Sequence, residues 1–337
     1  MSGTFQDGNI TRRSALAVLT SAGLGLAASG LPVLASDPTS DLLSQRLPKF
    51  TEKSRSLLRE LLENSSYSGQ IPAEAVSTLA RNQSTTVEKL MMELLPLAQS
   101  YSRAPISNFF VGVVARGASG SLYTGANIEI PGQCLGFAVH AEQSALSNAY
   151  MHGERSVTAL AVGGAPCGHC RQFINEMSPD GEILILTPKD PPAKLSAILP
   201  SAFGPAALGM THGAFPVEEK DLKLLVDSAD PLTLAALDAA RKSYAPYSKS
   251  PAGIAIRGGR GRVFRGSYIE NVAFNPSLSP LQTALAAMIA AGEPYSAISA
   301  VTLVEVVGAK ISQRNVTAAV MGAIAPGVKL EVVSARN

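Results

Sequence analysis

The chain repeats one stretch of itself, and this repeat constrains the fold more than any other feature. Shifted by 141 residues, segment 104–129 aligns without gaps with segment 245–270, since 104 + 141 = 245 and 129 + 141 = 270. Ten of the 26 positions are identical, namely Ala104, Pro105, Ser107, Gly112, Arg116, Gly117, Gly120, Gly125, Ile128 and Glu129. The chain therefore carries two copies of one structural unit.

Each copy has the pattern of an α/β unit. Alternating apolar residues around a Gly-rich turn predict a β-hairpin at the start of each copy. A helix is predicted next in "AVHAEQSALSNAYM" and "LSPLQTALAAMIAAG", followed by a buried strand in "SVTALAVGG" and "SAVTLVEVVG". We therefore expect a three-layer α/β/α fold.

The domain boundaries follow from this pattern. Residues 37–90 are expected to form a small helical region, with one further helix over about 87–101. The first copy is assigned to residues 91–212 and the second to residues 213–337.

Composition excludes two classes of protein. Three cysteines in 337 residues cannot form a disulfide scaffold. A net charge of +2 gives no strong field for a polyanion, so nucleic acid is not expected as a partner. The basic stretch 257–262, "RGGRGR", aligns with a turn of the first copy, so we interpret it as a hairpin turn with solvated arginines.

The N-terminus has the pattern of an export signal. Residues 11–16, "TRRSAL", precede the modestly apolar run "ALAVLTSAGLGLAASGLPVLAS". This pattern predicts a twin-arginine signal in residues 1–36, cleaved after Ala35, and hence a periplasmic enzyme. A cytoplasmic extension is the alternative. The run is short and interrupted by Gly and Pro, so stable membrane association is not expected.

Cys167 and Cys170 form a Cys-x-x-Cys pair that suits either a redox dithiol or half of a metal site. His140 favours the metal, because one helix and one strand separate it from Cys167 and return the chain to the same sheet edge. One imidazole and two thiolates make three zinc ligands and leave the fourth position open for water. The expected cofactor is one Zn²⁺ per chain.

Glu142 lies two residues after His140, where it can move protons instead of binding the metal. His-x-Glu followed by Pro-Cys-x-x-Cys is the signature of zinc deaminases that act on nucleobases. Between the two cysteines, His169 is expected beside the ligands or facing solvent. Cys134 is expected to be a packing residue.

With these motifs, the chain resembles the long-chain, homodimeric cytidine deaminases of bacteria and plants. The resemblance extends from about residue 40 to 330 and rests on "VHAEQSA", "PCGHCRQF", "GANIE", "AFGP", "PYSKSP" and "FNPSLSPLQ". It implies that His140, Cys167 and Cys170 hold zinc and that Glu142 is the proton shuttle. It also implies substrate contacts, from Asn127 and Glu129 to the ribose hydroxyl, from Phe109 and Phe203 to the pyrimidine, and from Ala141 and Pro166.

Phe109 has an alternative role as hairpin core, although alternation along a strand makes its neighbour Phe110 the expected core residue.

The second copy lacks the residues that are expected to bind zinc, move protons and contact the base. His140 aligns with Ser279, Glu142 with Leu281 and Phe109 with Ser250. Glu270 matches Glu129, but Tyr268 takes the place of Asn127. The resemblance implies that this copy is a non-catalytic domain that completes a homodimer and helps to close the partner's pocket.

The predicted activity is hydrolytic deamination of cytidine and 2′-deoxycytidine to uridine and 2′-deoxyuridine, with release of ammonia, in pyrimidine salvage. A deaminase acting on a polynucleotide is one alternative. It is disfavoured because an Asn127/Glu129 pair that buries the 3′-hydroxyl leaves no room for a following phosphate. A redox or structural zinc protein without catalytic activity is the other alternative.

Overall fold

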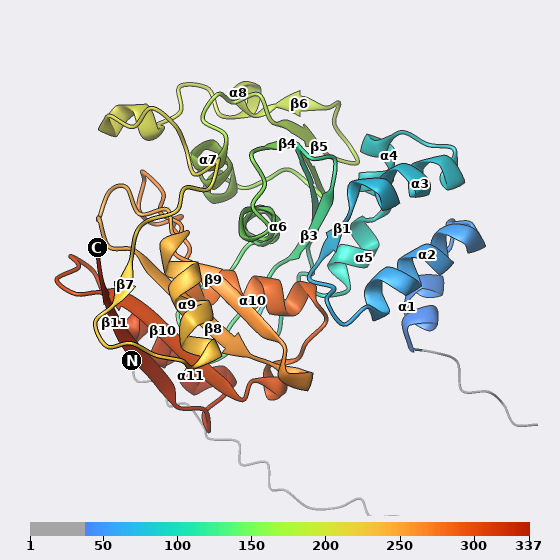
Figure 1. The fold of residues 1–337 in the computed structure, drawn as a ribbon. Helices are drawn as coiled ribbons and strands as arrows, with labels where there is room; N and C mark the ends of the chain where they lie inside the picture. Colours follow the sequence, from blue (N-terminus) through green and yellow to red (C-terminus); the bar gives the residue numbers. More distant parts are fainter. Residues whose placement is uncertain (1–37) are drawn as a thin grey trace, which may run out of the picture. The chain divides into compact units, whose positions relative to one another are not determined.

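The computed structural model describes residues 38–337, and every structural statement below concerns these residues. The predicted twin-arginine signal and its cleavage point after Ala35 lie outside the described residues. The described residues group as one unit (Figure 1), so the domain boundaries predicted at 90/91 and 212/213 stay predictions. No helix in the described part of the chain has the length and apolar character that a bilayer span requires.

The N-terminal region is helical, as expected. Its helices are α1 (Pro38–Arg46), α2 (Glu52–Glu63), α3 (Ala73–Gln83), α4 (Val87–Glu93) and α5 (Leu95–Gln99). The single helix predicted over 87–101 is wrong, because the segment is divided at Leu94 into α4 and α5. Pro96 lies in the first turn of α5, where its missing N–H costs nothing, whereas inside one long helix it would remove a hydrogen bond.

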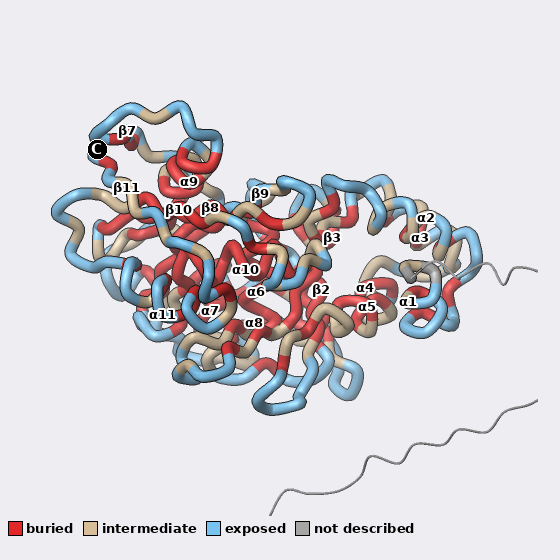
Figure 2. Tube along the Cα trace, turned by 90° about the horizontal axis from the view of Figure 1, so that it is seen from below, coloured by how far each residue is buried: buried red, intermediate tan, exposed pale blue. Residues whose placement is uncertain are grey.

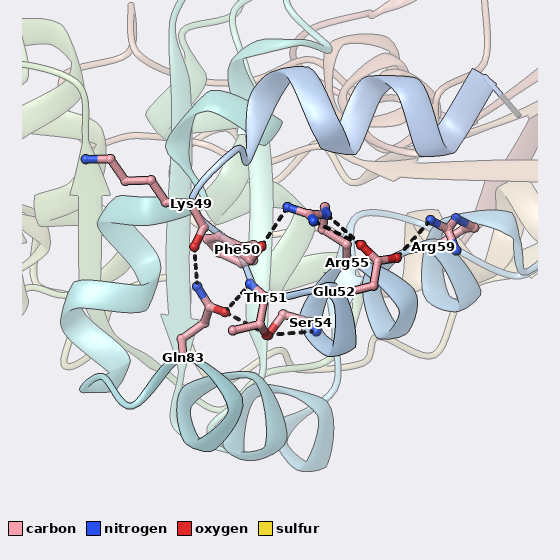
Figure 3. A network of polar contacts seen from close by, with 8 residues as sticks. All are labelled: Lys49, Phe50, Thr51, Glu52, Ser54, Arg55, Arg59 and Gln83. Atoms are coloured by element: carbon pink, nitrogen blue, oxygen red, sulfur yellow. Dashed lines mark hydrogen bonds and ion pairs between the residues drawn. The ribbon is translucent and has the colours of Figure 1, made fainter. Parts of the chain in front are cut away.

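The start of α2 is held by the last residue of α3 (Figure 3). Thr51 caps α2 by accepting a hydrogen bond from the Ser54 amide at 3.3 Å. Gln83 Oε1 accepts from the Thr51 amide at 2.8 Å and from the Ser54 hydroxyl at 3.1 Å. One carboxamide thus links two helices that lie about thirty residues apart in the sequence.

The first copy forms a six-stranded sheet in the order β1-β3-β2-β4-β5-β6. Its strands are β1 (Gln70–Ile71), β2 (Gly112–Gly117), β3 (Leu122–Ala126), β4 (Val157–Val162), β5 (Leu184–Leu186) and β6 (Ala193–Lys194). Only β4 and β5 run parallel. Edge strand β1 comes from the N-terminal region and pairs with β3, with Gln70 opposite Tyr123.

The second copy repeats this topology in a five-stranded sheet ordered β7-β11-β10-β8-β9. Its strands are β7 (Lys223–Leu224), β8 (Ala252–Arg257), β9 (Val263–Ser267), β10 (Ala300–Val306) and β11 (Leu330–Arg336). The hairpin β8–β9 corresponds to β2–β3, and the parallel pair β10–β11 corresponds to β4–β5. The repeat seen in the sequence is thus a repeat of structure.

The longer helices after α5 also fall into pairs. They are α6 (Ala141–Met151) with α10 (Pro280–Ala290), and α7 (Gly168–Met177) with α11 (Arg314–Ile324), while α9 (Pro231–Arg241) matches α5. Short helical turns complete the chain: η1 (Leu135–Phe137), α8 (Leu195–Ile198), η2 (Pro205–Leu208), η3 (Gly259–Gly261) and η4 (Tyr295–Ala297).

Two glycines of the first hairpin show that helices cover both faces of the sheet. A Cβ on Gly125 would lie 2.2 Å from the Ala145 amide of α6, and one on Gly112 would lie 2.7 Å from the Leu95 carbonyl oxygen of α5. Gly125 pairs with Val113, the neighbour of Gly112, so the two glycines point to opposite faces. The expected three-layer α/β/α fold is confirmed.

Helices α6 and α10 form the centre of the molecule, and Figure 2 shows both in the colour of buried residues. Their Gln residues make reciprocal bonds between the copies. Gln143 Nε2 donates to the Pro276 carbonyl at 2.9 Å, and Gln282 Nε2 donates to the Phe137 and Ala138 carbonyls at 3.3 Å. Each copy's helix therefore anchors the loop that precedes the other copy's helix.

The basic turn of the second copy differs from expectation at Arg262. Its side chain is only 19% exposed, and it forms an ion pair with Glu293 at 3.5 Å. It also stacks over Phe264 and donates to the Tyr67 carbonyl. These contacts join the N-terminal region to the second copy. They also keep the Arg262 side chain largely out of solvent.

Candidate active site

His140 is held at the N-terminus of α6 by the residues around it. Val139 forms an antiparallel bridge with Ile128, at the end of the first hairpin. The Gln143 carboxamide then accepts a hydrogen bond from the His140 amide at 3.1 Å. The hairpin and the helix together therefore hold the backbone of His140 on both sides.

The two cysteines lie in the first turn of α7. Cys167 is the N-cap residue of this helix and is exposed, whereas Cys170 is buried. The loop after β4 delivers them, and β4 lies next to β2 in the sheet. The N-terminal end of a helix favours negative charge, so both sulfurs lie where the backbone stabilises thiolates.

The structure brings His140, Cys167 and Cys170 together. His140 Nδ1 lies 3.6 Å from Cys167 Sγ and 3.3 Å from Cys170 Sγ, and the two sulfurs are 3.5 Å apart. Tetrahedral zinc, with bonds of about 2.3 Å to sulfur and about 2.0 Å to nitrogen, places its ligand atoms about 3.5–3.8 Å apart. The donor set and spacing fit Zn²⁺. Among the described residues, this trio is the one His/Cys/Asp/Glu cluster of that kind.

Glu142 lies beside the metal ligands in a buried position and is 5% exposed. Burial raises the pKa of the Cys170 thiol, and the charges of Glu142 and Cys167 raise it further. A divalent cation reverses this effect, because it stabilises the thiolate directly. Glu142 is thus near enough to act on the same centre without being one of the three clustered ligands.

His169 and Cys134 flank the cluster. The His169 ring stacks on that of His140, with centroids 5.0 Å apart and planes at 28°, so it lies beside the ligands, in one of the two places expected for it. Burial, together with the nearby His140, lowers the pKa of His169. The packing role predicted for Cys134 is wrong, because its side chain is exposed at the start of η1.

Glu129 and Asn127 lie at the end of the first hairpin. The Glu129 carboxylate accepts hydrogen bonds from the Ile106 amide at 2.8 Å, from the Ser107 amide at 3.0 Å and from the Ser107 hydroxyl. Burial acts to raise the pKa of Glu129, but these three hydrogen bonds outweigh it and lower the pKa. The carboxylate is therefore ionised and fixed in place.

Both the oxygen and the nitrogen of the Asn127 carboxamide form hydrogen bonds within the protein. Its Oδ1 accepts from the Ser102 hydroxyl at 2.5 Å and from the Val111 amide at 2.8 Å. Its Nδ2 donates to the Phe109 carbonyl at 2.9 Å. One amide hydrogen remains for a ligand, so Asn127 can donate to a hydroxyl oxygen while Glu129 accepts from a hydroxyl.

The aromatic residues of the predicted pocket lie on exposed loops. Phe109 is 70% exposed and Phe203 is 51% exposed. The core role predicted for Phe110 is wrong, since its side chain is 49% exposed. Strand β2 begins only at Gly112, so Phe110 lies in an irregular segment before it, where strand alternation does not apply.

Ala141 and Pro166, the remaining predicted substrate contacts, are buried next to the ligands His140 and Cys167. The Pro166 carbonyl accepts a hydrogen bond from Arg171 Nε at 2.8 Å.

The second copy retains the framework of this site without its ligands. Ser279 takes the place of His140 and caps α10 through a hydrogen bond from the Gln282 amide at 3.2 Å. Leu281 is buried in the core. Glu270 accepts from the amides of Tyr247 at 2.8 Å and Ser248 at 3.1 Å, as Glu129 does from the equivalent residues.

Sequence reasoning missed the contacts that brace α7 from the second copy. Glu176 is fully buried and accepts from the Tyr244 hydroxyl at 2.8 Å, the Tyr247 hydroxyl at 2.5 Å and the Val272 amide at 2.8 Å. Asn271 Nδ2 donates to the Gln172 carbonyl at 3.0 Å. A single sequence carries no signal for these contacts, because the partners lie 68 to 99 residues apart along the chain.

Comparison with known proteins agrees with this geometry. The family model for the cytidine and deoxycytidylate deaminase zinc-binding region matches residues 85–186, and a second model of the same description matches residues 195–318.

Relatives described as cytidine deaminase match along most of their length. The protein of Aeromonas salmonicida is 44% identical over 77% of this chain and 88% of its own. That of Shewanella sediminis is 41% identical over 80% and 90%, and that of Vibrio parahaemolyticus is 40% identical over 87% and 98%. With family models of the deaminase zinc-binding region matching both copies, and relatives matched along most of their length, the chain belongs to the cytidine deaminase family.

Proposed function

We propose that this chain is a zinc-dependent hydrolase that converts cytidine and 2′-deoxycytidine to uridine and 2′-deoxyuridine with release of ammonia. The observation that carries the proposal is the convergence of His140 Nδ1 and the Sγ atoms of Cys167 and Cys170, with the Glu142 carboxylate buried beside them. The similarity to cytidine deaminases over most of the chain supports the substrate class.

The three ligands would hold zinc, which when bound supplies the Lewis acidity that ionises water near neutral pH. As water adds to C4 of the pyrimidine, Glu142 would accept its proton and deliver it to N3, and it would then carry a proton to the C4 amine as the C4–N bond breaks and ammonia leaves.

Recognition of the sugar is assigned to Glu129 and Asn127. Glu129 is ionised and fixed by its bonds to Ile106 and Ser107, so it can accept a hydrogen bond from a ribose hydroxyl. The remaining amide hydrogen of Asn127 can donate to the same oxygen. The Phe109 and Phe203 rings are both exposed on loops and are suited to contact the flat base.

The substrate proposal is tested by following ammonia release from cytidine, 2′-deoxycytidine, single-stranded DNA and tRNA. We expect turnover on the free nucleosides, stoichiometric zinc in the purified protein and loss of activity in a strong chelator. Turnover only on a polymer would replace the proposal with a polynucleotide deaminase. Zinc without any turnover would favour a non-catalytic zinc protein.

We also propose that the chain works as a homodimer. Several large apolar side chains are exposed in the single chain, including Phe109, Leu135 at 73%, Phe203 and Phe274 at 66%. A second copy that covers these side chains would remove apolar surface from water and shield the pocket. Light scattering on the purified protein tests this, and a monomer with full activity would contradict it.

Export is proposed from the twin-arginine pattern in residues 11–16, and it would place the enzyme in the periplasm. Pyrimidine salvage is the proposed role of its products. Fractionation with N-terminal sequencing of the mature chain tests the location. A chain with an intact N-terminus in the cytoplasm would support the alternative.

A further inference from the structure

The Phe203 segment is held to the rest of the protein by contacts with α7. Phe203 lies in a stretch without regular secondary structure, between Ser201 and η2. Its carbonyl accepts hydrogen bonds from Gln172 Nε2 at 2.8 Å and, with a longer distance of 3.4 Å, from Asn175 Nδ2. The helix that carries the metal-binding cysteines therefore also positions the ring assigned to the pyrimidine.

The Gln172 carboxamide is in turn bonded by the second copy. Its Nε2 lies 3.4 Å from Asn271 Oδ1, and Asn271 Nδ2 donates to the Gln172 carbonyl at 3.0 Å. Asn271 is fully buried, and its Oδ1 also accepts from the Ala273 amide at 2.9 Å. Asn271 therefore has a fixed orientation, and it presents an acceptor and a donor to one residue of α7.

These hydrogen bonds fix the orientation of the Gln172 carboxamide. An amide group has two N–H bonds, and here one points to the Phe203 carbonyl and the other to Asn271 Oδ1. Without the acceptor at Asn271, the half-buried Gln172 side chain regains rotamer freedom, and the Phe203 carbonyl keeps only the 3.4 Å contact to Asn175.

From these contacts we propose that Asn271 of the second copy is a positioning residue, which fixes the Phe203 wall of the pyrimidine pocket through Gln172. Asn271 touches neither the metal ligands nor the exposed Phe203 ring in the hydrogen bonds described, so its effect passes through α7. The proposal rests on the proposed function, since it assigns Phe203 to the pyrimidine.

The first test measures the surroundings of residue 203 directly and needs no substrate. The chain contains no Trp, so Phe203→Trp creates a single fluorescent reporter at the wall. In that background we expect Asn271→Ala to shift the emission to longer wavelength and to increase acrylamide quenching, because the loop loses its fixed position.

The controls separate this effect from general damage. Asn315→Ala removes the same side chain from an exposed position of α11 in the same copy and should leave the emission unchanged. Gln172→Met keeps the length of the side chain without its carboxamide and should reproduce the shift. It also tests the proposal should Asn271→Ala fail to fold. Unchanged emission in a folded Asn271→Ala or Gln172→Met protein would overturn the proposal.

The second test is kinetic. Contact with the pyrimidine ring is made in both the ground state and the transition state, so we expect Asn271→Ala to raise KM for cytidine about tenfold with kcat nearly unchanged and zinc content unaffected. A fall in kcat or in bound zinc at constant KM would contradict the proposal that Asn271 positions Phe203. If the unsubstituted chain does not deaminate cytidine, the proposed function fails, whereas the fluorescence test still decides whether Asn271 positions Phe203.

Discussion

The two copies of the repeat share one framework, and only the first carries the metal cluster. Glu129 and Glu270 hold equivalent turns, and Gln143 and Gln282 fix the starts of equivalent helices. The copies differ where chemistry needs particular atoms, with His140 replaced by a capping serine and Glu142 by a buried leucine. Residues common to both copies therefore maintain the fold, and the residues that form the metal cluster occur only in the first.

The largest expected effect comes from removing a metal ligand. Cys170→Ala should reduce zinc from about one per chain to none and lower deamination at least about 10³-fold, because zinc supplies several kcal/mol of charge stabilisation. In the second copy, Ser279 takes the place of the ligand His140, and Ser279→Ala removes only a helix cap, so it should cost about 1 kcal/mol of stability with zinc retained. Elemental analysis and chemical denaturation measure the two results. Zinc retained by Cys170→Ala would show that the ligand assignment is incorrect.

The next effect concerns proton transfer. Glu142→Gln keeps the shape of the side chain but cannot carry the proton, so kcat should fall about 10²–10⁴-fold with zinc still bound. Leu281 is the equivalent residue of the second copy and lies in the core. Leu281→Met exchanges one apolar side chain for another, so kcat should change less than about twofold. Steady-state kinetics together with metal content checks both. An unimpaired Glu142→Gln enzyme would remove the distinction between the copies at this position.

A smaller effect should separate the shared carboxylates. Glu129→Ala and Glu270→Ala each remove bonds to two backbone amides, so both should lose stability. Only Glu129→Ala should also lower kcat/KM for cytidine, by about 10–100-fold, because it alone lies in the copy with the metal site. Equal losses of kcat/KM in the two variants would mean that Glu129 acts through the fold alone.

The smallest effect is a pH dependence at the junction of the copies. Burial raises the pKa of Glu176, and hydrogen bonds from Tyr247, Val272 and Tyr244 offset only part of this rise. A carboxyl with a raised pKa in the folded state contributes stability at low pH that is lost as the pH rises through that pKa.

Glu176→Gln does not titrate, so its stability should lack this dependence. The cost of the substitution, about 1–3 kcal/mol in acid, should therefore shrink as the pH rises above the ordinary range of glutamate. Urea denaturation from pH 4 to 8 measures the difference. A cost that grows with pH would indicate that the folded state favours the ionised form.

The repeat allowed much of the fold to be predicted, because its glycines and alternating residues reflect local packing. Gly112 and Gly125 permit helices to approach the sheet closely, and such a requirement leaves a trace in the sequence. The metal cluster was also predictable, since its three ligands come from a short motif pair with specific chemistry.

Features that depend on distant partners could not be predicted in this way. Phe110 follows the alternation expected of a strand, but the strand begins two residues later. Arg262 belongs to a basic turn, but its carboxylate and carbonyl partners lie far away in the sequence. Asn271 and Glu176 brace α7 through contacts about one hundred residues distant, and a single sequence gives no signal for such pairs.

The reciprocal bonds of Gln143 and Gln282 have an evolutionary consequence. Each donates to the loop that precedes the other copy's central helix, as identical subunits do about a twofold axis. This is the pattern left when two self-associating ancestors become one polypeptide. The second copy can therefore lack the metal ligands and still be needed, because its packing face supports the loop and the helix of the copy that holds them.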